Sequence, residues 1–282
     1  MVGRPTPAGP PPPGKPLGRN LPTAIAVGVT LAGAFLGTLL ADPLSFMVFI
    51  GAMVVLGLLE LDKAFRRRGW RPATPVAAGA GLICVVGAYT SGPSGQAVGL
   101  VVAVLGSLVW ALFDRHRTTV VAGVGATLLM TLWVPFLSSF IGLLLARPNG
   151  EWFVMATVAL TVTSDIAAFA FGNRFGRRRL APSISPAKTW EGFAGSLVTV
   201  VALAGLGTAR VPGFDATSAL LLGVVVCLAA TAGDLAESMV KRDLGVKDFG
   251  GILPGHGGIM DRADAVIFAL PAGHLLLSAL GK

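Results

Sequence analysis

Two polar segments near the C-terminus carry the residue types that could do chemistry in an otherwise apolar chain. In the first, AATAGDLAESMVKRD, Asp234, Glu237, Ser238 and Lys241 stand at i, i+3, i+4 and i+7. This spacing places the four side chains on one face of a helix. We expect that face to meet protein, water or ligand rather than lipid. The alternative is an exposed helix end, where Glu237 and Lys241 form only a solvated pair.

The second segment, LGVKDFGGILPGHGGIMDRAD, is too polar to span a membrane and is rich in glycine. A glycine-rich backbone can approach a phosphate closely and point N–H groups toward it. Asp261 and Asp264 lie one turn apart at the start of the last apolar stretch. There Asp264 could act as a ligand or could simply favour the helix N-terminus. The candidate residues of this segment are Lys247, Asp248, His256, Gly257, Gly258, Asp261, Arg262 and Asp264.

Carboxylates predominate over His in both segments, and no Cys lies among them. Such a donor set favours a hard cation such as Mg²⁺, which binds a few carboxylates and completes its shell with water and substrate phosphates. The neighbouring Lys and Arg residues can neutralise phosphate charge that the metal does not reach. Together the two segments predict phosphoryl-transfer chemistry.

A third polar stretch, GNRFGRRRLAPSISPAKTWEG, precedes another apolar stretch. The hydroxyls of Ser185 and Thr189 and the ammonium of Lys188 are suited to contacts with a phosphate or a sugar. The basic run 177–179 is instead expected to serve membrane orientation or contacts with anionic lipid.

Acids inside apolar stretches are functional candidates, because each costs roughly 2.5–3.5 kcal/mol at the centre of a spanning helix. Asp165, Asp234 and Glu237 are the cases here. Asp165 lies about 13 Å from Arg174 along a helix. It could border the same cavity or pair with a basic residue.

The elements that must position these residues are membrane-spanning helices. The chain has 282 residues, 54% hydrophobic and 13% charged, and a mean hydropathy of +0.76. These values exclude an ordinary soluble domain. Stretches of about 20 apolar residues fit helices rather than barrel strands. We predict an all-α polytopic membrane protein with about nine spans, near 22–40, 44–61, 74–92, 96–113, 119–145, 151–172, 190–208, 216–236 and 264–280.

The basic residues predict a cytoplasmic N-terminus. With that orientation, all 22 Lys and Arg residues except Arg147, Arg210 and Lys282 fall in cytoplasmic segments, as the positive-inside rule requires. We expect a disordered Pro-rich cytoplasmic tail at 1–21, N-terminal transmembrane helices at 22–150 and a catalytic half at 151–282. The spans of the first half contain almost no polar residues, so the chemistry is expected in the second.

Two residue types inside the spans have structural interpretations. Cys84 and Cys227 are expected to be small buried side chains without a disulfide or a zinc site. Pro135 and Pro271 are expected to kink their helices or to free a backbone carbonyl.

The stretch SMVKRDLGVKDFGGILPGHGGIMDRAD resembles the C-terminal motif of the phosphatidate cytidylyltransferases, or CDP-diacylglycerol synthases, and SPAKTWEG resembles a second segment of that family. Ala263 and Ala187 depart from the usual residues, and the second departure leaves fewer cations for a nucleotide. The positions that match the long motif are Ser238, Lys241, Arg242, Lys247, Asp248, Pro254, His256, Gly257, Gly258, Asp261, Arg262 and Asp264.

The resemblance implies that CTP and phosphatidic acid react to give CDP-diacylglycerol and pyrophosphate. It implies a multi-pass protein of a bacterial inner or plasma membrane, in contact with membrane lipids, with Mg²⁺ required, a homodimer and no nucleic-acid partner. It also implies that Asp234 and Asp261 are the metal ligands. We assign catalytic roles to Asp234, Asp261, Lys241, Lys247, Asp248 and His256, and substrate contacts to Ser185, Lys188, Thr189, Ser238, Arg242, Gly257, Gly258, Arg262 and Asp264.

Two other function classes are open to such a chain. An ion-coupled transporter could place Asp165, Asp234 and Asp261 along a path, but the dense polar groups are predicted on one membrane face. An enzyme that transfers an alcohol onto CDP-diacylglycerol would resemble an Asp-x-x-Asp-Gly pattern, and this chain contains no Asp-Gly dipeptide.

Overall fold

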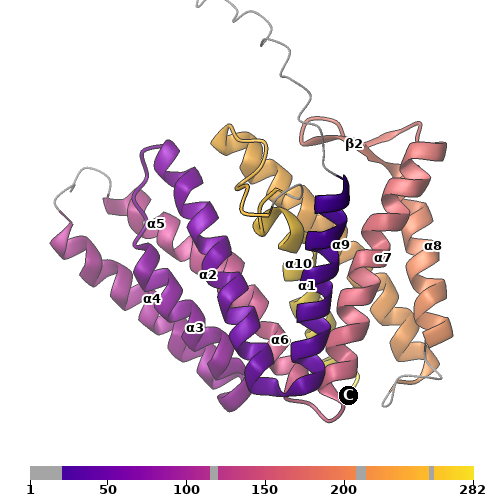
Figure 1. The fold of residues 1–282 in the computed structure, drawn as a ribbon, viewed down its shortest axis with the longest axis horizontal. Coiled ribbons are helices and arrows are strands. Elements are labelled where there is room, and N and C mark those ends of the chain that lie inside the picture. Colours follow the sequence, from indigo (N-terminus) through magenta and orange to yellow (C-terminus); the bar gives the residue numbers. More distant parts are fainter. Residues whose placement is uncertain (1–20, 115–119, 208–213, 254–256) are drawn as a thin grey trace, which may run out of the picture.

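The computed structural model describes residues 21–114, 120–207, 214–253 and 257–282. These form a helical bundle in which α2 to α5 lie to one side and α7 and α8 to the other, with α1, α9 and α10 between them in this view (Figure 1). The helices are α1 (Leu21–Ala41), α2 (Pro43–Arg67), α3 (Thr74–Ser91), α4 (Pro93–Phe113), α5 (Val120–Thr131), η2 (Leu132–Phe136), α6 (Leu137–Leu145), α7 (Gly150–Phe175), α8 (Trp190–Gly207), α9 (Ala216–Leu244) and α10 (Met260–Ala279).

The predicted all-α membrane architecture is confirmed. Within the described residues, 8 helices are long and apolar enough to cross a membrane, and Ile25–Ala41 of α1 forms a shorter apolar helix. The segments α5, η2 and α6 together make one of these spans, Val120–Leu145. Eight of the nine predicted apolar stretches therefore correspond to candidate spans, and the first, 22–40, corresponds to the shorter apolar helix.

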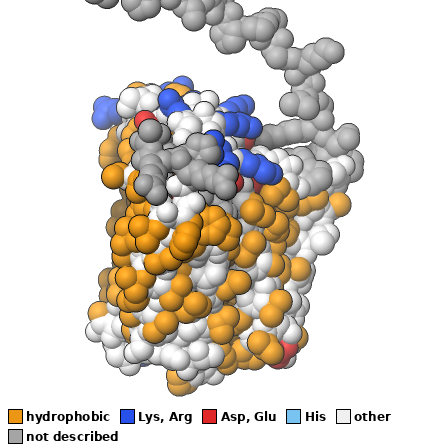
Figure 2. Space-filling view, turned by 90° about the vertical axis from the view of Figure 1, so that its left-hand side faces the viewer, with side chains coloured by type: hydrophobic (Ala, Val, Ile, Leu, Met, Phe, Trp, Pro, Cys, Tyr) orange, Lys and Arg blue, Asp and Glu red, His pale blue; other side chains and the backbone are white. Residues whose placement is uncertain are grey.

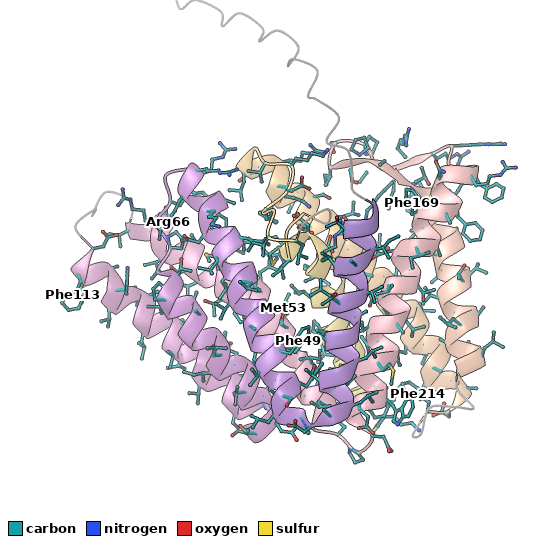
Figure 3. All side chains as sticks on the ribbon, viewed as in Figure 1. Phe49, Met53, Arg66, Phe113, Phe169 and Phe214 are labelled. Carbon is teal, nitrogen blue, oxygen red and sulfur yellow. The ribbon has the colours of Figure 1, made fainter. Side chains whose placement is uncertain are left out.

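The surface separates into an apolar flank and a basic end. Lys and Arg side chains gather at one end of the visible face, while hydrophobic side chains cover the flank below them (Figure 2). Phe113 and Phe169, labelled in Figure 3, are 81% and 76% exposed. Such exposure of large apolar side chains suits contact with lipid.

Pro135 changes the hydrogen bonding of its helix, as predicted. It lies in the π-helical segment η2, because proline has no N–H to donate to the preceding turn. A Cβ at Gly81 of α3 would lie only 2.7 Å from Cβ of Pro135, so glycine allows α3 to pack against this segment. Pro271 lies within α10. Cys84 and Cys227 are buried and unpaired, as expected.

Helix α2, in the N-terminal half, packs against the start of α10. Its buried side chains Leu58, Leu61 and Phe65 belong to the same apolar core as Met260. A Cβ at Gly57 would lie 3.2 Å from Sδ of Met260, so the two helices approach closely here. This packing holds the N-terminal residues of α10 against α2.

The all-α prediction misses a short hairpin between α7 and α8. Strands β1 (Arg179–Ala181) and β2 (Ser185–Thr189) pair antiparallel, with Arg179 opposite Thr189 and Ala181 opposite Ser185. The carboxylate of Glu191 accepts hydrogen bonds from the backbone N–H groups of residues 177 and 178. The hairpin is thereby fixed to the first turn of α8, at the same end of the bundle as the α9–α10 connection (Figure 1).

Candidate active site

Helix α9 supplies the polar face predicted from the sequence. It is capped at its start by Asp215, and it ends at Gly245, whose φ of 69° is a left-handed conformation that suits glycine. In its last turns Asp234 forms an ion pair with Lys188 of β2. Ser238 Oγ donates to Asp234 Oδ1 at 3.4 Å. The hairpin and α9 therefore meet through a carboxylate and an ammonium.

Lys241 occupies the centre of a second group of charges. Its Nζ lies 3.0 Å from Oε1 of Glu237 and 3.0 Å from Oδ1 of Asp261. The ammonium also lies 5.8 Å from the centre of the Phe249 ring, within range of a cation–π interaction. The side chain of Glu237 is fully buried. The alternative that Glu237 and Lys241 form only a solvated pair is therefore wrong.

Asp261 anchors the glycine-rich connection as well as Lys241. Its Oδ2 accepts the N–H of Gly258 at 2.9 Å and that of Phe249 at 3.2 Å. Gly257 has a φ of 84°, a conformation that side chains other than glycine rarely adopt. One carboxylate thus fixes two points of the loop beside the ammonium of Lys241.

A further group of acids lies where α9 and α10 pack closely at Gly233. A Cβ at Gly233 would lie 2.6 Å from the backbone oxygen of Asp264, so glycine is needed for this approach. The carboxyl of Asp264 interacts with those of Glu237 and Asp234. Asp165 of α7 interacts with Asp234 and Asp264, and also with Lys188. Asp165 therefore lies near this group of acids, and its role stays a prediction.

Glu60 of α2 also reaches this region, although the sequence pointed to chemistry in the second half only. It is fully buried, and its Oε2 accepts the N–H of Met260 at 3.1 Å. Glu60 is thus one of the few polar residues in the spans of the first half, and it contacts the start of α10. Helical periodicity could have indicated that Glu60 is buried, because it lies three residues from Gly57 and four from Ala64, which are also buried.

Of the other predicted site residues, Thr189 and Arg242 make hydrogen bonds within the protein, and several of the rest are half-buried or exposed. Thr189 is buried, and its Oγ1 accepts the N–H of Gly192, so its hydroxyl caps the start of α8. Arg242 donates from Nε to the carbonyl of Ile184 at 3.3 Å, which links α9 to the hairpin. The remaining predicted side chains line the same end of the bundle: Ser185 is half-buried, and Lys247, Asp248 and Arg262 are exposed. His256 lies outside the described residues.

The donor set suits a divalent cation that is completed by substrate. The carboxylate of Glu237 is fully buried between the ammonium of Lys241, which lies 3.0 Å from Oε1, and the carboxyl of Asp264. Within the described part of the chain, no group of three or more His, Cys, Asp or Glu side chains could hold a metal by itself. Mg²⁺ often binds one or two carboxylates and takes its other ligands from water and phosphate. The oxygen-rich site fits that mode rather than an all-protein cage.

Comparisons with known proteins show the family to which the chain belongs. The sequence model of the cytidylyltransferase family matches residues 22–280. A phosphatidate cytidylyltransferase of Mycobacterium leprae is 35% identical over 279 residues, covering 93% of this chain and 89% of the relative. One of Pseudomonas aeruginosa is 34% identical over 275 residues, covering 93% and 94%. One of Mycobacterium tuberculosis is 33% identical over 276 residues, covering 93% and 84%. The chain belongs to the cytidylyltransferase family.

Proposed function

We propose that the protein is a phosphatidate cytidylyltransferase of a bacterial membrane, which condenses CTP with phosphatidic acid to give CDP-diacylglycerol and pyrophosphate. The observation that carries the proposal is the meeting of three motifs at one end of the bundle. Lys188 of the hairpin contacts Asp234 of α9, and Lys241 of α9 contacts Asp261 of α10. The match of the family over residues 22–280 supports the same activity.

The location suits both substrates. The basic end of the bundle is the predicted cytoplasmic end, where CTP is dissolved and where the phosphate of a membrane lipid lies at headgroup depth. The site lies between spans, so a lipid can present its phosphate without leaving the bilayer. Catalysis at this depth requires groups that neutralise the charge of several phosphates, and Lys188 and Lys241 are placed there.

The reaction needs little proton transfer from the protein. The lipid phosphomonoester has a second pKa near 6, by analogy with phosphorylated side chains, so it is largely dianionic at pH 7. One of its oxygens forms a bond to the α-phosphorus of CTP, the bond from that phosphorus to the bridging oxygen of the β-phosphate breaks, and pyrophosphate leaves. Positioning and charge neutralisation can supply the catalysis.

We assign roles to the chain's own residues accordingly. Asp234 and Asp261 would hold Mg²⁺, and Asp264 and Glu237 add negative charge beside them. A bound Mg²⁺ would neutralise triphosphate oxygens and the charge that develops on the leaving group. The phosphate contacts are assigned to Lys188, Lys241 and Lys247, and further nucleotide or lipid-phosphate contacts to Ser185, Thr189, Ser238, Arg242, Asp248, His256, Gly257, Gly258, Arg262 and Asp264.

Three further assignments are part of the proposal. The choice of Mg²⁺ rests on the carboxylate donors and the absence of Cys from the polar segments. A homodimer rests on the family resemblance, and it is tested by the mass of the detergent-solubilised protein. The division into a transmembrane half at 22–150 and a catalytic half at 151–282 is proposed with Glu60 as an added contribution from the first half.

The transporter alternative finds no support. A transport path would need polar groups along the depth of the membrane. The acids Asp165, Asp234 and Asp264 instead interact with one another as one group.

The test is an assay of the purified protein in vesicles that contain phosphatidic acid. Each of the four ribonucleoside triphosphates is added separately, with and without Mg²⁺, and pyrophosphate and the lipid product are both followed. We expect release of pyrophosphate and formation of CDP-diacylglycerol only with CTP, phosphatidic acid and Mg²⁺ together. Pyrophosphate release that does not depend on the lipid would contradict the proposal.

A further inference from the structure

Glu60 is the buried acid for which the proposed reaction gives no role. It stands on α2, 200 residues before Met260, whose N–H it binds. Its second oxygen, Oε1, is buried without a hydrogen-bond partner within the described residues. Burying a carboxylate is costly unless its contacts compensate. The contacts of this carboxylate therefore indicate which part of the structure it holds in place.

Within the described residues, the backbone N–H groups around the Glu60 carboxylate belong to the connection between α9 and α10 and to the start of α10. Besides Met260, the backbone N–H groups of Ile252 and Ile259 lie near the same carboxylate. These N–H groups belong to the two ends of the glycine-rich loop and to the start of α10. The first turn of a helix has N–H groups without intrahelical partners, and α10 has no side-chain cap of its own. Glu60 supplies that acceptor from a different helix.

Two glycines of the loop lie so close to the Glu60 side chain that neither has room for a Cβ. A Cβ at Gly250 would lie 2.1 Å from Oε1 of Glu60, and a Cβ at Gly258 would lie 2.6 Å from Oε2. The same Cβ at Gly258 would lie 2.8 Å from Oδ2 of Asp261. Gly258 is therefore enclosed by two carboxylates, one from the first half of the chain and one from the catalytic motif.

We propose that Glu60 is a positioning residue for the reaction: through its contacts with Met260, Gly250 and Gly258 it fixes the glycine-rich loop in the form that binds the phosphates of CTP. It acts through the loop backbone and touches no substrate. The inference rests on the proposed function, because the loop's ligand is CTP only if that function holds. It gives the N-terminal half a role in the site.

The test compares Glu60→Ala and Glu60→Gln in the phosphatidate vesicle assay. Glutamine keeps an oxygen that can accept the Met260 N–H, whereas alanine removes it. We expect Glu60→Ala to lower kcat/KM for CTP about 100-fold, since a misplacement of ~1 Å can have this effect, with KM for phosphatidic acid unchanged. Glu60→Gln should restore most of the loss. Wild-type constants for a folded Glu60→Ala protein, or equal losses in both variants, would overturn the inference.

Leu61→Ala serves as the matched control for stability. Leu61 is the next residue of α2 and is fully buried in the core, so its truncation lowers Tm while the carboxylate of Glu60 and its hydrogen bond from the Met260 N–H are kept. We expect KM for CTP to be unchanged in Leu61→Ala. A rise in its KM for CTP equal to that of Glu60→Ala would mean that general loosening of α2 explains the effect, and would overturn the inference.

A second pair of variants keeps the inference testable if Glu60→Ala fails to fold. Gly250→Ala places a methyl group against Glu60, whereas Gly251→Ala meets nothing within 4 Å. We expect only Gly250→Ala to lower kcat/KM for CTP, and Glu60→Ala with Gly250→Ala to be no worse than Glu60→Ala alone. Equal effects of the two glycine variants would overturn the inference. A wild-type protein inactive with CTP would instead contradict the proposed function.

Discussion

The ammonium of Lys241 lies 3.0 Å from Oδ1 of Asp261, and this contact joins α9 to the first turn of α10. The same ammonium lies 3.0 Å from Oε1 of Glu237, so one cation lies between two carboxylates. Removal of one partner from a buried charged group leaves an uncompensated charge, which destabilises a protein strongly. Lys241 therefore contributes both to the stability of this end of the bundle and to its chemistry.

Substitution of Lys241 should change stability and turnover together. Lys241→Met leaves Glu237 and Asp261 without their shared ammonium, so we expect a loss of about 3 kcal/mol in the free energy of unfolding. It also removes a proposed phosphate contact, so turnover should fall. Denaturant unfolding in detergent and the CTP assay measure the two effects.

The double variant Glu237→Gln with Lys241→Met separates charge from packing. It removes one of the two uncompensated carboxylates, so it should regain part of the lost stability without regaining activity. A double variant less stable than Lys241→Met alone would contradict the assignment of the destabilisation to unpaired charge.

Gly233 should tolerate no side chain, because it permits the approach of α9 to α10. Gly233→Ala would place Cβ 2.6 Å from the backbone oxygen of Asp264. We expect lower Tm and weaker CTP turnover, since the acids of the two helices would be moved apart. Gly79→Ala on α3 is the matched control, since nothing lies within 4 Å of its added Cβ. The prediction is wrong if the two alanine variants behave alike.

Lys188 should act on nucleotide affinity. We expect Lys188→Gln to raise KM for CTP about tenfold, equivalent to ~1.4 kcal/mol, because Lys188 is the basic residue that the hairpin contributes to Asp234. Arg177→Gln is the control: its backbone N–H bound by Glu191 is kept, so KM for CTP should hardly change. Equal changes in both variants would indicate a general effect of basic charge at the membrane surface.

Asp215, at the start of α9, should affect stability alone. The N–H of Ser218, together with the ammonium of Lys282, holds the pKa of Asp215 below its ordinary value. The contribution of this carboxylate is therefore present above the ordinary pKa of ~4 and is lost as the pH falls below it. Asp215→Ala should lower Tm at neutral pH, and its difference from wild type should shrink in acid. Its constants for CTP should equal those of the wild-type protein.

The spans and the polar face of α9 could be predicted from the sequence because each depends on local spacing. A run of about 20 apolar residues determines a membrane helix wherever it occurs, and Asp234, Glu237 and Lys241 share a face through helical periodicity alone. The pairing of Lys188 with Asp234 depends on tertiary structure, so only the chemistry of the two motifs could suggest it.

Glu60 and the hairpin were not predicted, for different physical reasons. Glu60 lies beside Asp62 and Lys63, so it resembles a solvated helix end, and its partner Met260 is 200 residues away. The hairpin strands are only 3 and 5 residues long. Alternation over so few residues cannot be distinguished from a loop, and their position depends on the carboxylate of Glu191.

The most direct test of the proposed site is the Mg²⁺ dependence of CDP-diacylglycerol synthesis in Asp234→Asn and Asp261→Asn, with Asp215→Asn as a control at the other end of α9. We predict that both site variants fold, lose about 100-fold or more in turnover and do not recover at high Mg²⁺, while the control follows the wild-type curve. A folded Asp234→Asn or Asp261→Asn protein with the wild-type Mg²⁺ curve would contradict the account.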